Sequence, residues 1–316
     1  MRQVRRVRSA AVSAGRYAPS PSGDLHLGNL RTAMLAWLCA RSTGRRFLLR
    51  YEDLDSGRTV QGSEQRQLQD LHALGVTFDG AVIRQSERYA HYDDAVAALR
   101  ARDLVYECFC TRRDIQDAPR APHSPPGAYP GTCRHLSERQ RQQRRAERPA
   151  AWRLRTDPRE VTVEDVLLGE VSAVLDDVVV VRNDGAPAYN LAVVVDDHLT
   201  GVDQVVRGED LASSAPRQAH LRGLLYGDDA FSEVQYVHVP LVLNEQGKRL
   251  AKRDGAVTLE QLEVQGHSAD AVRDALLGSL GLPVGTLSAA LEGFAPDATL
   301  SAGVSEQVRL PEPLLP

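Results

Sequence analysis

Long apolar runs, cysteines and lysines are all scarce in this sequence of 316 residues. No apolar stretch approaches the roughly 20 residues that a helix needs to cross a bilayer, so we predict a cytoplasmic protein that does not contact a membrane. Four cysteines are too few for a disulfide scaffold in a chain of this length. The net charge of −4 gives no overall signature of nucleic-acid binding, so any RNA contact has to come from a local patch.

Lysine is the rarest of the charged residues and is confined to one place. Of the 38 basic residues only Lys248 and Lys252 are lysines, and both lie in GKRLAKRDG. A lysine ammonium is a compact, mobile charge that suits a phosphate, whereas a guanidinium is a rigid planar fork. The pairing of the two lysines predicts that this loop needs an ammonium group.

The first part of the chain alternates between strand-like and helix-like segments. Residues 1–14 are basic but lack the apolar centre of a secretory signal, so we interpret them as a flexible extension rather than an organelle address. Residues 15–104 run strand, helix, strand, helix, helix, which predicts a parallel sheet with crossover helices. We assign them to the first half of a nucleotide-binding domain.

The middle of the chain interrupts this pattern. Residues 105–150 are dense in proline, glycine and charge and have too little apolar content to fold unaided, which predicts an insertion held by a metal. Residues 151–200 are predicted to be a β-rich connection, with strands in AWRLR, DDVVVVRND and AYNLAVVVDD. The α/β pattern returns in residues 201–262, and residues 263–316 form a short helical C-terminal segment. The predicted fold is therefore a doubly wound, Rossmann-like α/β domain split by an insertion.

One candidate site lies in the turn APSPSGDLHLGN, where a strand ends and a helix begins. Backbone N–H groups at a helix start attract phosphate, and Gly28 would allow a ligand to approach the backbone closely. His26 could donate a hydrogen bond to a phosphoryl oxygen as charge builds up on it. Taken alone, the same residues also fit a turn with a surface histidine. The lysine loop would place positive charge on the other side of a triphosphate.

Together the two segments resemble the paired signatures of the class I aminoacyl-tRNA synthetases. HLGN at 26–29 is similar to the signature HIGH, and RLAKR at 249–253 is similar to KMSKS. The segments GRYAPSPSGDLHLGNLRTAMLAW, RYEDLD, PAYNLAVVVDDHLTGVDQVVRGEDL and VPLVLNEQGKRLAKRDG resemble the glutamate branch in sequence order. The resemblance covers about residues 15–262. Asn29, Arg249 and Ala251 depart from the signatures at positions where the glutamate branch varies.

The resemblance implies the following site residues. His26 and Lys252 would stabilise the phosphorus as the carboxylate of glutamate displaces pyrophosphate from ATP, with Mg²⁺ as the companion ion of the nucleotide. Gly28 and Asn29 would contribute to ATP binding beside them. The positions that match glutamate-binding residues are Arg16, Ala18, Ser20, Glu52, Tyr189 and Arg207. An arginine grips a carboxylate with two hydrogen bonds, and Glu52 could receive the substrate ammonium.

Length favours one branch of the family. Residues 253–316 leave little room after Lys252 for the large anticodon-binding region of a discriminating glutamyl enzyme. A truncated core with a cysteine-containing insertion resembles the glutamyl-queuosine tRNA(Asp) synthetases. That family activates glutamate without tRNA and esterifies it to the queuosine base at the wobble position of tRNA(Asp), in a single-stranded loop that a protein can read. We expect a monomer with this activity.

The insertion carries the cysteine pattern that we expect to hold zinc. Cys108, Cys110 and Cys133 would supply three thiolates of a tetrahedral structural site, one zinc per chain. From the residues alone the fourth ligand would be His123 or His135, whereas the resemblance supplies Tyr129, which we follow. The arginine-rich helix at 139–148 could touch RNA phosphates, although it fits a solvated helix face equally well.

Three other functions fit parts of the sequence. A truncated glutamyl-tRNA synthetase would charge the 3′ end of a tRNA, so the identity of the acceptor would distinguish it from a glutamyl-queuosine tRNA(Asp) synthetase. A nucleotidyltransferase with a similar histidine turn would not need the glutamate-binding set. A non-catalytic RNA-binding relative would not need His26 and Lys252.

Overall fold

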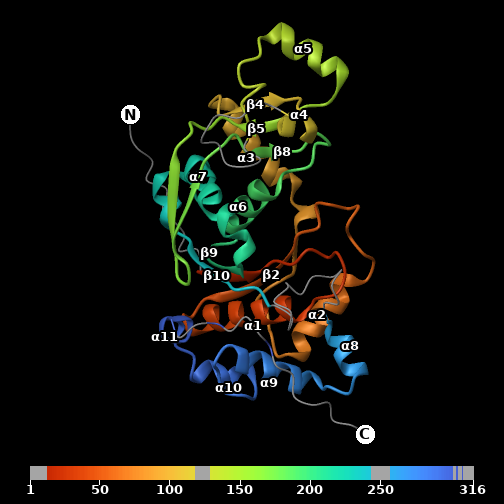
Figure 1. The fold of residues 1–316 in the computed structure, drawn as a ribbon, viewed down its shortest axis with the longest axis vertical. Helices are drawn as coiled ribbons and strands as arrows, with labels where there is room; N and C mark the ends of the chain where they lie inside the picture. Colours follow the sequence, from red (N-terminus) through yellow and green to blue (C-terminus); the bar gives the residue numbers. More distant parts are fainter. Residues whose placement is uncertain (1–12, 118–128, 243–256, 302–303, 305–307, 309–316) are drawn as a thin grey trace.

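The computed structural model describes residues 13–117, 129–242, 257–301, 304 and 308. Lys248, Lys252 and His123 lie outside these ranges. Within them, the predicted class of a parallel α/β core interrupted by an insertion is confirmed (Figure 1).

A seven-stranded sheet forms the centre of the molecule. In spatial order its strands are β3 (Ile83–Arg84), β2 (Arg46–Tyr51), β1 (Ala14–Tyr17), β9 (Val202–Gly208), β10 (Gln235–Val239), β6 (Glu160–Asp165) and β7 (Gly169–Val174). The first six strands run parallel, and β7 is antiparallel to β6. Because β1 pairs with β2 on one side and β9 on the other, segments far apart in the sequence complete a single sheet.

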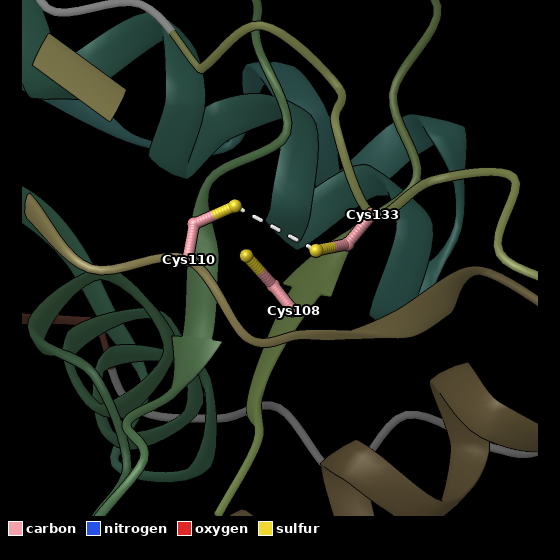
Figure 2. Close-up of side chains that lie close together, drawn as sticks. All are labelled: Cys108, Cys110 and Cys133. Carbon is pink, nitrogen blue, oxygen red and sulfur yellow. Dashed lines mark hydrogen bonds between the residues drawn. The ribbon is translucent and has the colours of Figure 1, made fainter. Parts of the chain in front are cut away.

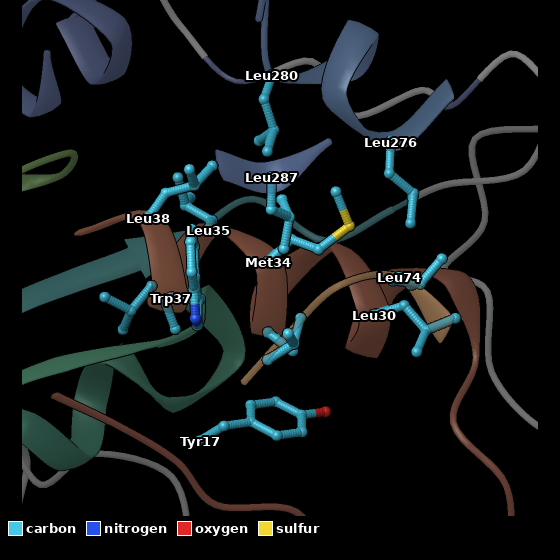
Figure 3. Close-up of a cluster of buried hydrophobic side chains, with 14 of the residues drawn as sticks. Tyr17, Leu30, Met34, Leu35, Trp37, Leu38, Leu74, Leu276, Leu280 and Leu287 are labelled. Atoms are coloured by element: carbon cyan, nitrogen blue, oxygen red, sulfur yellow. The ribbon is translucent and has the colours of Figure 1, made fainter. Parts of the chain in front are cut away.

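One face of the sheet is covered by α1 (Leu27–Ser42), which is buried on almost all sides. An amphipathic stripe is not needed in a helix that packs between two layers, and α1 has the sheet on one side and the C-terminal helices on the other (Figure 3). Met34, Leu276 and Leu287 belong to this shared core. The other helices of this region are α2 (Ser63–Ala73), α8 (Leu259–Val264), α9 (Ala269–Ser279), α10 (Leu287–Glu292) and α11 (Pro296–Ser301).

The opposite side holds α3 (Tyr89–Ala101), α6 (Tyr189–Leu199) and α7 (Ala215–Tyr226). Apolar side chains of these three helices form a second core, which includes Leu99, Leu191 and Leu221. The remaining turns of helix are η1 (Gln85–Glu87), η2 (Glu209–Ser214) and η3 (Asp228–Ser232).

The strand predicted in AYNLAVVVDD is wrong, because these residues form α6. The run Leu191–Asp197 is buried throughout, and periodicity cannot distinguish a fully buried helix from a buried strand. The strands predicted in AWRLR and DDVVVVRND are present as β5 (Ala151–Leu154) and β8 (Val179–Val181).

A smaller antiparallel sheet lies near one end of the molecule, in the order β4 (Val105–Cys108), β5, β8. The short helix α4 (Arg112–Asp117) and the exposed helix α5 (Glu138–Glu147) accompany it. The hairpin of β6 and β7 extends from this part of the chain to the main sheet, where β6 pairs with β10. Alternate residues of β6 are buried, as expected of a strand with one covered face. The sequence analysis did not assign this hairpin.

Candidate active site

The histidine turn is built as a helix cap. His26 is the N-cap of α1, where its Nδ1 accepts from the backbone N–H of Asn29 at 3.3 Å, and the Asn29 side chain accepts in return from the backbone N–H of His26 at 3.3 Å. This reciprocal pair satisfies backbone donors that a helix start leaves open. A neutral imidazole that accepts at Nδ1 carries its proton on Nε2, so His26 is a donor there.

The turn before the histidine is fixed by hydrogen bonds from side chains of α2. Gln67 donates from Nε2 to the carbonyls of Ser20 at 3.1 Å and Gly23 at 2.6 Å. Ser63 Oγ donates to the carbonyl of Pro21 at 2.7 Å. These contacts fix the path of the chain from the end of β1 to the start of α1.

Both ends of the segment that carries the lysines lie beside this turn. Val242 lines the same cavity as His26. After the segment, the carbonyl of Val257 accepts from the backbone N–H of Leu27 at 3.2 Å, and Thr258 forms an antiparallel bridge with His26. Lys252 itself lies outside the described residues, so its meeting with His26 remains a prediction.

A cavity of about 390 Å³ opens at the carboxyl ends of β1, β2, β9 and β10. This is where ligands bind in open parallel α/β sheets. Nine residues predicted for the glutamate and ATP sites line it: Arg16, Ala18, Ser20, His26, Gly28, Asn29, Glu52, Tyr189 and Arg207. The structure therefore brings together every predicted residue of these sites that it describes.

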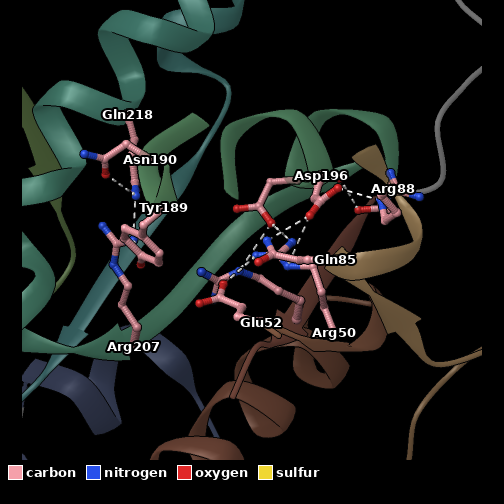
Figure 4. A network of polar contacts seen from close by, with 12 residues as sticks. Arg50, Glu52, Gln85, Arg88, Tyr189, Asn190, Asp196, Arg207 and Gln218 are labelled. Atoms are coloured by element: carbon pink, nitrogen blue, oxygen red, sulfur yellow. Dashed lines mark hydrogen bonds and ion pairs between the residues drawn. The ribbon is translucent and has the colours of Figure 1, made fainter. Parts of the chain in front are cut away.

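The charged side chains at the base of the cavity pair with one another (Figure 4): Arg16, Arg50 and Asp197 are buried, and Glu52 is partly buried. Arg50 contacts Asp197 at 2.5 Å and donates to Glu52 Oε1 at 3.2 Å. The Nε of Arg16 lies 3.6 Å from the same Asp197 carboxylate. Burial raises the pKa of Glu52, outweighing the opposite effect of Arg50 and Arg16. Burial acts on Asp197 in the same sense, but there the charges of Arg50 and Arg16 prevail and the pKa is lowered.

A second network extends from the other wall of the cavity. Arg207 Nη1 donates to the hydroxyl of Tyr189 at 3.3 Å and to Gln218 Oε1 at 2.8 Å, and Gln218 Nε2 donates to Asn190 Oδ1 at 3.1 Å. Burial, followed by the charge of Glu52, raises the pKa of Tyr189, so its hydroxyl remains protonated. The cavity thus presents the guanidiniums of Arg16 and Arg207, the carboxylates of Glu52 and Asp210 and the phenol of Tyr189.

The sequence analysis missed the residues that support this set. Asp196 ties α6 to residues 85–92, since it accepts from Gln85 at 3.0 Å and Arg88 at 2.6 Å (Figure 4) and from Tyr92 at 2.9 Å. Arg50 was visible within RYEDLD, and one of its partners, Glu52, lies in the same motif, but its buried partner Asp197 is 147 positions away in the sequence. No pattern in the neighbouring sequence indicates contacts between residues so far apart.

The three cysteines predicted as metal ligands also lie together (Figure 2). The sulfurs of Cys108, Cys110 and Cys133 are within 4.8 Å of one another, and those of Cys110 and Cys133 are 3.6 Å apart. Tetrahedral zinc with bonds of about 2.3 Å separates its sulfur ligands by roughly 3.8 Å. The Tyr129 hydroxyl lies 3.3 Å from Cys108 Sγ and 3.7 Å from Cys110 Sγ. Three thiols and a phenol therefore form a compact donor set that fits a tetrahedral metal.

Among the residues that the structure describes, no histidine joins this cluster. His135 is exposed and does not belong to the group of candidate ligands found among the described residues, and His123 lies outside them. Hydrogen bonds from Cys110 and Cys133 lower the pKa of the Cys108 thiol.

Arginines of helix α5 are paired with carboxylates of the helix itself and of β4. Arg145 contacts Glu107 at 2.5 Å and Glu138 at 2.7 Å, and Arg144 lies 3.5 Å from Glu147. A contact between this helix and RNA remains a prediction. Among the described residues, no helix has both the length and the apolar character required to cross a membrane.

Comparison with known proteins identifies similar chains. A family model described as the catalytic domain of class I tRNA synthetases (E and Q) matches residues 13–296. A Glutamyl-Q tRNA(Asp) synthetase of Nocardia farcinica is 59% identical over 271 residues, covering 85% of each chain. One of Cutibacterium acnes is 51% identical, covering 86% of this chain and 77% of the relative. A Glutamate--tRNA ligase of Bacillus pumilus is 37% identical, covering 83% of this chain and 58% of the relative.

A solved structure has the same architecture. The crystal structure of a glutamate tRNA ligase from Elizabethkingia meningosepticum, in complex with its amino acid, superposes with a TM-score of 0.76 at 26% identity. The match covers 95% of this chain and 67% of that one.

Proposed function

The chain belongs to the class I tRNA synthetases, in the Glutamyl-Q tRNA(Asp) synthetase family, and from this premise we propose that it activates glutamate with ATP without tRNA and transfers it to queuosine in tRNA(Asp). In the first step a carboxylate oxygen of glutamate attacks the α-phosphorus of ATP, and the bond to the β-phosphate breaks. Pyrophosphate leaves, and glutamyl-adenylate remains. In the second step a hydroxyl of the queuosine cyclopentenediol attacks the acyl carbon, and AMP leaves as the hydroxyl loses its proton.

One observation carries this proposal: the cavity matches the three charges of glutamate. Arg16 and Arg207 are 4% and 6% exposed, and Glu52 lines the same cavity. Two guanidiniums complement the two carboxylates of glutamate, and Glu52 complements its ammonium. Glutamine would present an amide N–H to an arginine donor, so we expect glutamate to be preferred.

The phosphates of ATP would bind at the start of α1. His26 and the backbone N–H groups of the first turn supply donors, and the helix dipole favours negative charge there. We propose that Lys252 approaches from the segment whose ends lie at Val242 and Val257, beside the same turn. Both groups would then act by positioning and charge, with Mg²⁺ accompanying the nucleotide.

Glutamate-dependent exchange of pyrophosphate into ATP, measured without tRNA, tests the activation step. We expect exchange with glutamate and far less with glutamine or aspartate. His26→Ala and Lys252→Ala should each lower the rate tenfold or more, and each factor of ten corresponds to about 1.4 kcal/mol of barrier. Lys248→Ala is the matched control and should have the smaller effect. Absence of exchange with glutamate, or near-normal rates in both variants, would contradict the proposal.

The acceptor requires its own experiment. We expect tRNA(Asp) that contains queuosine to be charged and the same tRNA without queuosine to remain uncharged. Equal charging of both, with the ester at the 3′ end, would favour the alternative of a glutamyl-tRNA synthetase core. The similarity to Glutamyl-Q tRNA(Asp) synthetases, which is 59% and 51% in two relatives against 37% for the Glutamate--tRNA ligase, supports queuosine.

We also propose that Cys108, Cys110, Tyr129 and Cys133 hold one structural zinc. Elemental analysis of the purified chain should find about one zinc per chain, since a set of three thiolates and one oxygen donor forms a closed tetrahedral site. Cys110→Ala should lose the metal, whereas Cys39→Ala should retain it, because Cys39 is buried in α1 away from the cluster. A folded preparation without metal would refute the zinc site and leave the proposed adenylation untouched. We further expect the protein to act in the cytoplasm as a monomer.

A further inference from the structure

Arg207 is hydrogen-bonded to His238, a histidine that does not line the cavity. The Nε of Arg207 donates to His238 Nε2 at 3.0 Å, and both side chains are buried. An arginine guanidinium is always protonated and can only donate, so His238 must accept at Nε2. The remaining proton of the neutral imidazole is therefore on Nδ1.

That proton is directed to a buried carboxylate. His238 Nδ1 lies 2.7 Å from Asp165 Oδ2, and the backbone N–H of His238 donates to the same oxygen at 3.0 Å. The other oxygen of Asp165 accepts from the backbone N–H groups of Leu167 and Leu168, both at 2.9 Å. Every donor around this carboxylate is thus supplied by β10 or by the turn between β6 and β7.

The environment keeps the imidazole neutral. His238 is 0% exposed, and burial lowers its pKa; the charges of Arg207 and Arg16 act in the same direction and the hydrogen bond and charge of Asp165 in the opposite one, but the pKa remains lowered. A proton on Nε2 would place two N–H donors opposite each other and remove the acceptor from Arg207. The hydrogen bonds from Arg207 to His238 and from His238 to Asp165 are therefore compatible with only one position of the imidazole proton, on Nδ1.

The orientation of Arg207 follows from its contacts. Nε is engaged by His238, Nη1 by Tyr189 and Gln218, and Nη2 by the carbonyl of Leu211 at 3.2 Å. Within the described residues, these contacts engage four of the five N–H groups that a guanidinium offers. The fifth belongs to Nη2, on a side chain that lines the cavity.

We propose that His238, fixed by Asp165, is a positioning residue that holds the Arg207 guanidinium in the orientation that binds a carboxylate of the substrate. This inference rests on the proposed glutamate activation and extends it to two residues that do not line the site. The hairpin of β6 and β7 then contributes to substrate binding through its turn, although it lies at the margin of the sheet.

Two substitutions at one position separate the two hydrogen bonds of the imidazole. In His238→Gln the amide reaches the position of Nε2 and can still accept from Arg207. In His238→Asn the shorter amide replaces Nδ1, so the contact with Asp165 survives and that with Arg207 is lost. We expect His238→Asn to raise KM for glutamate about tenfold or more, the effect of losing a charge-assisted hydrogen bond. His238→Gln should raise it by less than about threefold, and KM for ATP should stay within about twofold of wild type in both variants.

Asp165→Asn provides a second test in case His238→Asn does not fold. With its amide nitrogen towards His238, this variant favours the tautomer with the proton on Nε2, which opposes Arg207, so KM for glutamate should again rise while KM for ATP does not. His267→Asn and His267→Gln are matched controls, because His267 is a buried histidine, 7% exposed, that does not line the cavity. Both controls should keep the wild-type KM for glutamate.

The exchange assay distinguishes failure of this inference from failure of the proposed function. If the wild-type chain shows no exchange with glutamate, the proposed function is overturned and the inference falls with it. If the wild-type chain is active and neither His238→Asn nor Asp165→Asn changes KM for glutamate, only the inference is overturned. Equal increases in KM for glutamate and ATP would also overturn it, because they indicate a general loss of structure.

Discussion

At the scale of single residues, Gly28 offers a test of the position of the His26 ring. A Cβ at this position would lie 3.0 Å from His26 Cε1 and 3.1 Å from its Nδ1, so the ring would have to move by a few tenths of an ångström. The imidazole is also the N-cap acceptor of α1, so its displacement weakens the cap and offsets the preference of a helix for alanine over glycine, which is up to about 1 kcal/mol. We therefore expect Gly28→Ala to lower glutamate-dependent exchange severalfold while the melting temperature changes little, because the methyl group displaces the imidazole.

Gly223 in the middle of α7 is the matched control for this substitution. Its added Cβ would make an ordinary contact of 3.6 Å with Phe231. Gly223→Ala should gain stability without loss of exchange. If Gly28→Ala retained full activity, the position of the His26 ring would not matter for the reaction.

The residues that line the cavity could be predicted from the sequence, whereas most of the residues that hold them in place through hydrogen bonds could not. Arg16, Glu52 and His26 lie in short motifs whose chemistry is legible in the sequence. His238 and Asp165 are 73 positions apart and meet only because β6 joins the sheet beside β10. Nothing near either residue in the sequence indicates that pairing.

At the scale of elements, α2, α8 and the histidine turn meet around Asp70, whose pKa is raised to about 6. Burial is the main cause, and the charges of Asp24, Glu263 and Glu260 add to it. An acid whose pKa is higher in the folded chain than in the unfolded chain binds its proton more tightly when folded. Its stabilising contribution is therefore present at low pH and is lost as the pH rises from about 4 through about 6.

Asp70→Asn should remove this loss. We expect the variant to be more stable than wild type at pH 7 and to show a smaller decrease in melting temperature between pH 4 and pH 6, since the amide carries no charge. Thermal unfolding at several pH values measures both effects. The same decrease in the variant as in wild type would show that another group is responsible.

Helix α6, which was predicted to be a strand, illustrates how burial on all sides removes the polar positions that reveal a helical period. α6 reads as a continuous apolar run because it is covered by α3, α7 and the small sheet. Its last turn carries Asp196 and Asp197, which would be out of place in a buried strand unless arginines met them. Arg50 meets both of them, but only after folding brings β2 beside the helix.

At the scale of the whole molecule, the C-terminal helices and the nucleotide-binding sheet share one core through α1 (Figure 3). Leu276 of α9 is 0% exposed within it. Leu276→Ala should lower the free energy of unfolding by about 2–5 kcal/mol, the usual effect of a large cavity in a core. Urea unfolding, followed both by circular dichroism and by residual exchange activity, measures the change and should give one midpoint for the two signals.

Val284→Ala is the control, because Val284 is 66% exposed and its truncation should change the stability little. Loss of the helical signal of the C-terminal part well before loss of activity would contradict a shared core.

The strand order of the main sheet also bears on how the chain is made. β1 has β2 as one neighbour and β9 as the other, so one of its edges stays open until residues 202–208 have left the ribosome. At rates of synthesis of roughly 5–20 residues per second, this interval lasts on the order of 10–40 s. During it the nascent first half exposes backbone donors and acceptors that its own later half must cover. Chaperone capture of ribosome-bound chains should therefore decline once β9 emerges.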